Sequence, residues 1–237
     1  ILAAKNAAKN NYKTLLLDEK NELGGSTIFE NNESNKIDNK ISSEWLKKEI
    51  DELKNIKNLE IKTRTSVAAY HQYNYLLARE NLTDHLEKKD KTNKIRQRLL
   101  KIRAKKVILA TGALERPMVC NNNDSPGIML SSAIKKYSDF YGVACGRKIV
   151  FFTNNDSAYE SALSLNDKGI KVEAVVDIRK QSETNLEKRV IDAGVKIYWE
   201  HTVVDTSGYK RLNNVSIMKL SNDGTSVTGN KISISCD

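Results

Sequence analysis

The chain has 237 residues and a formal net charge of +9, a length that suits one large domain or two small ones, each with its own core. Its 39 Lys and Arg residues are spread among 30 Asp and Glu residues and do not gather beside a reader motif, which argues against a nucleic-acid partner. No apolar run reaches the length of a membrane span, and no signal peptide is visible. We therefore expect a cytoplasmic protein without membrane contact.

The cysteines predict reduced thiols and no metal site, because Cys120, Cys145 and Cys236 are odd in number and lack metal-ligand spacing. Cys120 falls in a polar loop, but no histidine partner or CxxC motif supports a redox role. The sequence starts inside a helical pattern at Ile1 and stops in or just after a strand. We interpret it as an internal fragment of a longer protein.

The first half of the chain alternates helix and strand before a series of short strands. A helical pattern over about 1–10 precedes an apolar strand at 13–18, a turn at Gly24-Gly25-Ser26 and a polar loop. A helix follows near 43–57, with Ser42 or Ser43 as its N-cap. Further strands are expected at 59–63, as a pair around a tight bend in 66–80, at 95–104 and at 106–112.

A connector at 114–146 carries both prolines and a helix over 129–141. The alternation then restarts, with strands at 147–153, 171–177 and 195–199 and helices at 156–168 and 184–193. The chain finishes with strands near 201–206, 209–220 and 227–235, and Asn213-Asn214 suits a hairpin turn.

Strand–helix–strand repetition predicts a parallel sheet, because parallel neighbours need a crossover that is usually helical. We predict the α/β fold class, with two tandem dinucleotide-binding domains of Rossmann-like FAD/NAD(P)-binding type, parallel sheets and inserted antiparallel strands. The expected divisions are a first domain at 1–113, the connector at 114–146 and a second domain at 147–237.

Candidate cofactor-binding residues follow the first strand. Its apolar run ends in Asp18, where a dinucleotide fold places an acid that accepts hydrogen bonds from the adenosine ribose hydroxyls. Gly24 and Gly25 then allow backbone conformations that other residues resist. A charged residue at a strand end followed by an ordinary turn explains the same pattern, so this stretch alone leaves both interpretations open.

The second candidate segment is "KVILATGALERP" at 106–117. A buried strand ending in Ala110, Thr111 and Gly112 brings backbone to the carboxyl edge of a sheet, where ligands of open α/β folds bind. Arg116 suits either a cofactor phosphate or an ion pair with an acid such as Glu115. The glycine-rich phosphate loop of such a domain is expected before Ile1, and we assign no catalytic residue.

The turn at 153–157, Thr-Asn-Asn-Asp-Ser, contains no glycine. In a nucleotide-binding strand–turn–helix this turn is normally glycine-rich, because backbone must approach the pyrophosphate. We expect a second domain that kept its fold and lost ordinary nicotinamide binding, with Asp156 or Ser157 as the helix N-cap. Asp177, at the end of the next strand, has the position of a ribose acid and is interpreted as structural or as a relic.

Three stretches carry a family resemblance: "TRTSVAAYHQYNYLLARENLTDHL" at 63–86, "RQRLLKIRAKKVILATGALERPMVCNNNDSPGIML" at 96–130 and "YGVACGRKIVFFTNNDSAYESAL" at 141–163. Together they closely resemble the α subunit of heterotetrameric sarcosine oxidase. The ATGA-x-ERP segment is similar also to hydrogen cyanide synthase and to heterotetrameric amino-acid dehydrogenases. The NYLLA-x-E-x-x-TDHL and FTNNDSAY stretches favour sarcosine oxidase.

The resemblance implies a complex that oxidises sarcosine to glycine with oxygen, giving peroxide and, with tetrahydrofolate, methylenetetrahydrofolate. It implies an α subunit that binds NAD and shares FMN with a β subunit, which carries FAD and oxidises sarcosine, and it implies γ and δ subunits as further partners. Tetrahydrofolate would be bound by a further C-terminal domain that this sequence does not include. By position, Asp18 matches the ribose acid, and the segments that line the dinucleotide match Gly24, Gly25, Ala110, Thr111 and Gly112.

The expected role of this fragment is therefore cofactor binding and scaffolding, without bond-breaking. One rival is a stand-alone pyridine-nucleotide:flavin oxidoreductase, which predicts a glycine loop near 153–157 and a CxxC motif, and the sequence has neither. A related secondary-amine or amino-acid dehydrogenase subunit is a second rival. A non-catalytic α/β interaction module without a cofactor is a third.

Overall fold

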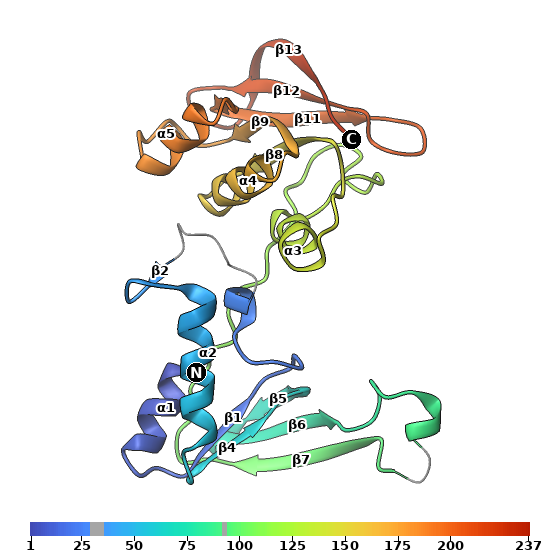
Figure 1. Ribbon diagram of the computed structural model, residues 1–237. Helices are drawn as coiled ribbons and strands as arrows, with labels where there is room; N and C mark the ends of the chain where they lie inside the picture. The colour runs from blue at the N-terminus through green and yellow to red at the C-terminus, as the bar shows by residue number, and fades with distance from the viewer. Residues whose placement is uncertain (29–35, 92–93) are drawn as a thin grey trace. The chain divides into compact units, whose positions relative to one another are not determined.

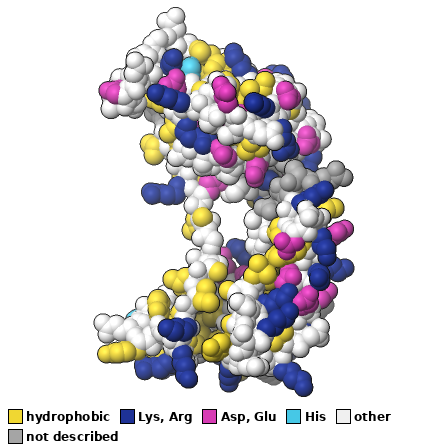
Figure 2. Space-filling model, turned by 90° about the vertical axis from the view of Figure 1, so that its left-hand side faces the viewer, with side chains coloured by type: hydrophobic (Ala, Val, Ile, Leu, Met, Phe, Trp, Pro, Cys, Tyr) yellow, Lys and Arg dark blue, Asp and Glu magenta, His cyan; other side chains and the backbone are white. Residues whose placement is uncertain are grey.

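The computed structural model describes residues 1–28, 36–91 and 94–237. It divides into two compact units, Ile1–Gly112 and Ala113–Asp237, which we call unit 1 and unit 2. Residues 29–35, in the polar loop expected before the second helix, lie outside the described residues. Figure 2 shows Lys and Arg side chains spread over the visible face, with Asp and Glu side chains among them, which is the pattern predicted from the sequence.

Unit 1 begins with a parallel pair of strands connected through a helix (Figure 1). β1 pairs with β4 over four residues, from Thr14 opposite Leu59 to Leu17 opposite Lys62. The elements in order are α1 (Leu2–Lys9), β1 (Thr14–Leu17), the 3-10 helix η1 (Gly25–Ile28), β2 (Lys36–Ile37), β3 (Lys40–Ile41), α2 (Ser42–Lys54) and β4 (Leu59–Lys62). The two strands predicted at 13–18 and 59–63, on either side of the helix, are confirmed as parallel neighbours.

An ion-pair cluster connects α1 and α2 of unit 1. α1 buries Ala4 and Ala8, and Lys5 Nζ lies 2.6 Å from Glu49 and 2.7 Å from Glu52 of α2. The hydrogen bonds from Lys5 and then Lys9 lower the pKa of Glu52 to about 2. The predicted Ser42 or Ser43 N-cap is wrong: β3 runs directly into α2, so Ile41 is the cap residue and Ser42 already has helical backbone.

An antiparallel sheet completes unit 1 and confirms the inserted strands. Its order is β5 (Thr65–His71), β6 (Tyr75–Asn81), β7 (Gln97–Arg103), with short 3-10 helices η2 (Gln72–Asn74) and η3 (Lys88–Asp90) in its loops. The tight bend at η2 places Tyr73 and Asn74 at positive φ, 60° and 54°.

The strand predicted at 106–112 is wrong. This stretch has no regular secondary structure, and Ile108 and Leu109 are 66% and 68% exposed. An apolar run forms a strand only when its backbone groups pair with a neighbour, and no backbone hydrogen bond within the described residues pairs this one. The β-propensity of Val107, Ile108 and Leu109 therefore does not decide its conformation.

Unit 2 contains a three-stranded parallel sheet of order β10-β9-β8. Its elements are α3 (Ser131–Tyr141), β8 (Lys148–Thr153), α4 (Ser157–Asp167), β9 (Lys171–Asp177), α5 (Asn185–Asp192) and β10 (Lys196–Trp199). Thr153 and Trp199 both lie opposite Asp177, so the three strands reach one carboxyl edge together. The predicted parallel α/β arrangement is confirmed.

Alternate residues of this sheet pack against two different layers. Ile149 and Phe151 join the core beneath α4 and α5, whereas Val150 and Phe152 pack toward a second sheet. That sheet is antiparallel, with the order β11 (His201–Ser207), β12 (Asn214–Leu220), β13 (Val227–Ser235). The period of two residues in side-chain direction thus produces the helix–sheet–sheet layering seen in the upper part of Figure 1.

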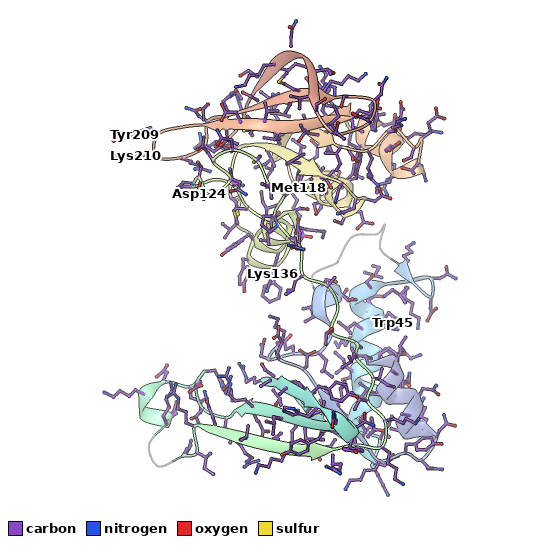
Figure 3. The ribbon with its side chains drawn as sticks, turned by 180° about the vertical axis from the view of Figure 1, so that it is seen from behind. Trp45, Met118, Asp124, Lys136, Tyr209 and Lys210 are labelled. Atoms are coloured by element: carbon purple, nitrogen blue, oxygen red, sulfur yellow. The ribbon has the colours of Figure 1, made fainter. Side chains whose placement is uncertain are left out.

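The hairpin turn predicted at Asn213-Asn214 is wrong in position. β11 ends at Ser207 and β12 starts at Asn214, so the connection is a loop of residues 208–213, with Tyr209 and Lys210 at its tip (Figure 3). Gly208 has φ +154°, and a Cβ added there would lie 1.9 Å from the Arg211 carbonyl oxygen. The loop closes by that close backbone approach, and Asn213 lies at its base, donating a backbone hydrogen bond to Ser207.

Candidate functional site

Asp18 lies directly after β1, at the carboxyl end of the parallel pair in unit 1. Its backbone pairs with Lys62 and Thr65, and its side-chain Oδ1 accepts a 2.9 Å hydrogen bond from the Lys20 amide. Its Oδ2 has no hydrogen-bond or ionic partner among the described residues, and the residue is half-buried. A carboxylate held in place through one oxygen therefore offers the other to a ligand hydroxyl.

The two glycines after Asp18 have different roles. Gly24, at φ +129°, would place an added Cβ 2.4 Å from Cδ2 of Leu46, so its lack of a side chain allows the loop to pack on α2. Gly25 opens η1 at φ +60°, and an added Cβ would meet nothing within 4 Å. Open space on that side of the backbone suits a ligand that must approach the main chain closely.

Ala110, Thr111 and Gly112 lie in the exposed stretch that follows β7 and not at a strand end. Gly112 has φ +70° and open space where its side chain would be. Nearby, Ile108 lines a hollow of about 390 Å³ with Ala3, Ala7 and Tyr12, and Asp18 is not among its lining residues. No described hydrogen bond therefore joins Asp18 to the Ala110–Gly112 segment, and this hollow does not connect them either.

Arg116 and Glu115 do not pair with each other. The Glu115 carboxylate accepts hydrogen bonds from the amides of Ser131 (2.9 Å) and Ser132 (2.6 Å), the first two residues of α3. A negative charge at these otherwise unsatisfied amides stabilises a helix N-terminus. Arg116 is exposed and has no ion pair among the described residues.

The glycine-free turn of unit 2 is held by its own side chains. Thr153 Oγ1 accepts a 3.1 Å hydrogen bond from the Asn155 amide and donates to the Asn155 carbonyl at 2.9 Å. Asn155 Oδ1 accepts from the Ser157 amide at 3.0 Å and from the Ser157 hydroxyl at 2.6 Å. Asp156 is the cap residue of α4 by backbone position, but the hydrogen-bonding side chain is that of Asn155, which the sequence did not indicate.

Asp177, at the end of β9, is 1% exposed and fully engaged. Tyr159 donates its hydroxyl to Oδ2 at 2.9 Å, and Arg179 donates from Nη2 to Oδ2 at 2.7 Å and from its amide to Oδ1 at 2.8 Å. Arg179 also reaches Oδ1 of Asp156 at 2.8 Å. Burial and then the hydrogen bond to Asp177 raise the pKa of Tyr159, and the hydrogen bond to Asp177 raises the pKa of Arg179.

Sequence patterns missed Tyr159 and Arg179. The only signal for Arg179 was its spacing of two residues after the strand-end acid, in Asp177-Ile178-Arg179. Tyr159 reaches Asp177 from α4, which no local spacing indicates.

Cys120 and Cys236 are placed unfavourably for thiolate chemistry. Burial, with a smaller effect of Asp205, raises the pKa of Cys120, and burial, with Asp237, raises the pKa of Cys236 to about 11. Across residues 1–28, 36–91 and 94–237, no group of three or more His, Cys, Asp or Glu side chains is placed to hold a metal ion. In the same residues, no helix combines the length and hydropathy needed to cross a bilayer.

Comparisons with known proteins give a family and a set of curated relatives. The family model described as pyridine nucleotide-disulphide oxidoreductase matches residues 1–236. Sarcosine oxidase subunit alpha of Corynebacterium sp. strain P-1 is 36% identical over 94% of this chain, and that of Rhizobium meliloti strain 1021 is 31% identical over 92%. The matches cover 23% and 21% of those relatives, so the chain spans less than a quarter of their length.

Two solved structures share the fold. The thioredoxin reductase of T. acidophilum matches 99% of this chain and 70% of its own, with a TM-score of 0.68 and 16% identity. The L-proline dehydrogenase of P. horikoshii matches 99% of this chain and 37% of its own, with a TM-score of 0.60 and 19% identity. At these identities the likeness concerns the fold.

Proposed function

Because the chain belongs to the pyridine nucleotide-disulphide oxidoreductase family, we propose that it is the cofactor-binding and scaffold part of the α subunit of a sarcosine-oxidase-type complex. In this proposal unit 1 binds NAD. The complex oxidises sarcosine to glycine with oxygen, giving peroxide and, with tetrahydrofolate, methylenetetrahydrofolate. A β subunit would hold FAD, which would supply the acceptor for the electrons of sarcosine, and FMN would be bound between the α and β subunits.

Asp18 carries the proposal for NAD. It is a strand-end carboxylate whose Oδ1 is held by the Lys20 amide and whose Oδ2 has no partner in the described part of the chain. These features fit the adenosine ribose, whose hydroxyls donate to an acid at this position of a dinucleotide fold. Bound NAD would supply a hydride acceptor, while Asp18 holds the ribose and Gly25 leaves room beside the backbone.

The remaining candidates complete the proposal with smaller roles. Ala110, Thr111 and Gly112 would lie along the dinucleotide, since Gly112 leaves open space where a side chain would project. Arg116 would bind a phosphate, because Glu115 is occupied by the α3 amides and leaves the guanidinium without an ionic partner among the described residues.

The role as a subunit rests on the likeness to chains that are themselves named as alpha subunits. The β, γ and δ subunits would be the partners, and sarcosine and tetrahydrofolate would bind elsewhere in the complex. In this proposal this part of the chain breaks no bond, and the raised pKa of the Cys120 and Cys236 thiols disfavours thiolate chemistry at those two positions.

The test is to purify the full-length complex from co-expressed subunits, release its cofactors and quantify NAD, FMN and FAD. We expect all three, and we expect Asp18→Asn to weaken NAD binding about tenfold, because one charge-assisted hydrogen bond is lost. Glu19→Gln is the matched control, since Glu19 is exposed and its one ion pair among the described residues is with Lys20. Sarcosine-dependent peroxide formation is the accompanying activity assay.

Other outcomes would replace the proposal with one of its rivals. A single subunit that carries FAD alone and consumes NADH would indicate a stand-alone pyridine-nucleotide:flavin oxidoreductase. A complex with the same cofactors but activity only on another secondary amine or amino acid would indicate a related dehydrogenase. A colourless protein that binds no dinucleotide would indicate an interaction module.

A further inference from the structure

The two strand-end acids of this chain, Asp18 and Asp177, accept the same kind of backbone hydrogen bond on Oδ1 and differ in the partners of Oδ2. Asp18 accepts the amide of Lys20 on Oδ1 at 2.9 Å, and Asp177 accepts the amide of Arg179 on Oδ1 at 2.8 Å, each from two residues later. Oδ2 of Asp177 is taken by Tyr159 and Arg179, whereas Oδ2 of Asp18 is without a partner in the described residues. A ribose hydroxyl would need that oxygen, and at 1% exposure Asp177 cannot present it.

In the turn before α4, too, the groups that a ligand would need are already hydrogen-bonded within the protein. In nucleotide-binding turns the backbone amides at a helix N-terminus point at phosphate oxygens. Here the Asn155 amide is taken by the Thr153 hydroxyl and the Ser157 amide by the Asn155 side chain, at 3.1 and 3.0 Å. Two donors that would hold a phosphate are therefore already satisfied by side chains of the turn.

Arg179 forms ion pairs with both sites, the strand-end acid and the turn before α4. Its guanidinium donates to Asp177 at the strand end and to Asp156 at the N-cap of α4, both through Nη2, at 2.7 and 2.8 Å. In a dinucleotide fold the ligand spans the same two points, with phosphate at the helix and ribose at the strand-end acid. Asp156 supplies the negative charge that the helix N-terminus favours, and Arg179 supplies the link.

We propose that Arg179, with Asp156, Asp177 and Tyr159, forms an internal substitute for a dinucleotide in unit 2, so that this unit excludes the cofactor. The exclusion of the cofactor from unit 2 is argued from contacts within unit 2 alone. The expectation that NAD binds in unit 1 rests in addition on the proposed function.

Hydrogen–deuterium exchange of the full-length complex, with NAD removed and then restored, separates the two units. We expect NAD to slow exchange of the amides in 14–26 and to leave those in 153–159 unchanged. Slower exchange in 153–159 would indicate that NAD binds in unit 2 and would overturn the proposal. If NAD leaves the exchange rates of both segments unchanged, the proposed function of unit 1 is contradicted, whereas the exclusion of NAD from unit 2 is supported.

Variants test the network itself. We expect Arg179→Met to keep the NAD content of the complex and to lower the melting temperature by about 5 °C, because Asp177 is left buried without its cation. Lys180→Met is the control, since Lys180 is exposed and forms no described ion pair. If Arg179→Met does not fold, Asp156→Asn removes only the exposed end of the link and is expected to lower the melting temperature less, again with NAD retained. Loss of NAD in a folded variant, or an Arg179→Met protein as stable as the control, would overturn the proposal.

Discussion

The Tyr159 hydroxyl on α4 donates a 2.9 Å hydrogen bond to Oδ2 of Asp177 at the end of β9, and both side chains are almost fully buried. This bond fastens a helix to the carboxyl edge of the parallel sheet in unit 2. Together with Arg179 it satisfies a buried carboxylate, which would be costly to leave unpaired in the protein interior.

Removing the Tyr159 hydroxyl tests this bond. We expect Tyr159→Phe to lower the free energy of unfolding by about 1–3 kcal/mol, because the ring still packs while one hydrogen bond to a buried charged group is lost. Chemical denaturation of both proteins measures the difference. Tyr209→Phe is the control, since Tyr209 is 96% exposed, and equal losses in the two variants would contradict the role of the bond.

Asp139 makes the stability of unit 2 depend on pH. Its side chain is 4% exposed and pairs with Lys135 and Lys168. Burial opposes its ionisation, but the hydrogen bonds from the two lysines outweigh burial and lower the pKa of Asp139 from its usual 3.8. The native state therefore holds this proton less tightly than the unfolded state, so the stabilisation is present above about pH 5 and is lost as the pH falls through 3.8 and below.

We expect Asp139→Asn to cost about 2 kcal/mol at neutral pH, because Lys135 is left largely buried without its anion. The difference between variant and wild type should shrink as the pH is lowered from about 5 to about 3. Denaturation curves across this range measure it. A difference that stays constant with pH would show that Asp139 does not titrate as its contacts indicate.

Glu115 is expected to stabilise α3 as a remote cap. Glu115→Ala should lower the free energy of unfolding by about 1 kcal/mol, since the Ser131 and Ser132 amides lose a charged acceptor. Arg116→Ala should leave stability unchanged, because Arg116 has no ion pair among the described residues. Equal losses from the two substitutions would instead support the Glu115–Arg116 ion pair that the sequence left open.

Gly24 and Gly25 form a matched pair for separating packing from cofactor approach. Gly24→Ala should be the more destabilising, because it adds a clash of 2.4 Å with Leu46 to an unfavourable φ of +129°. Gly25→Ala should cost only about 1 kcal/mol for its left-handed backbone, while lowering NAD affinity in the complex. Thermal melts and NAD titration measure the two effects, and an unchanged affinity in Gly25→Ala would remove Gly25 from the proposed site.

Local pattern determined most of the elements in unit 2. The strand–helix alternation from Lys148 to Trp199 was predicted to within two residues at its ends, because each strand is an apolar run and α4 and α5 carry their own periodic apolar residues. The capping box of α5, in which Thr184 and Glu187 bond each other's backbone amides, is likewise a local signal.

Two of the wrong predictions have a physical cause that the residue pattern of the segment does not show. The stretch 106–112 has the composition of a buried strand, yet it forms no ladder in the described structure, because a strand is stabilised by a neighbour and not by its own residues. The loop 208–213 is shaped by the close approach of Gly208 to Arg211, which outweighs the turn preference of Asn213-Asn214.

The sequence by itself determined that two strands end in an acid, in "TLLLD" and "EAVVD", since that follows from an apolar run and the residue after it. Only the tertiary structure decided that these acids differ. Asp177 receives Tyr159 from a helix 18 positions earlier in the chain, whereas no described side chain reaches Oδ2 of Asp18. The availability of a carboxylate to a ligand depends on which groups the fold brings to it, and the order of residues around it does not record that.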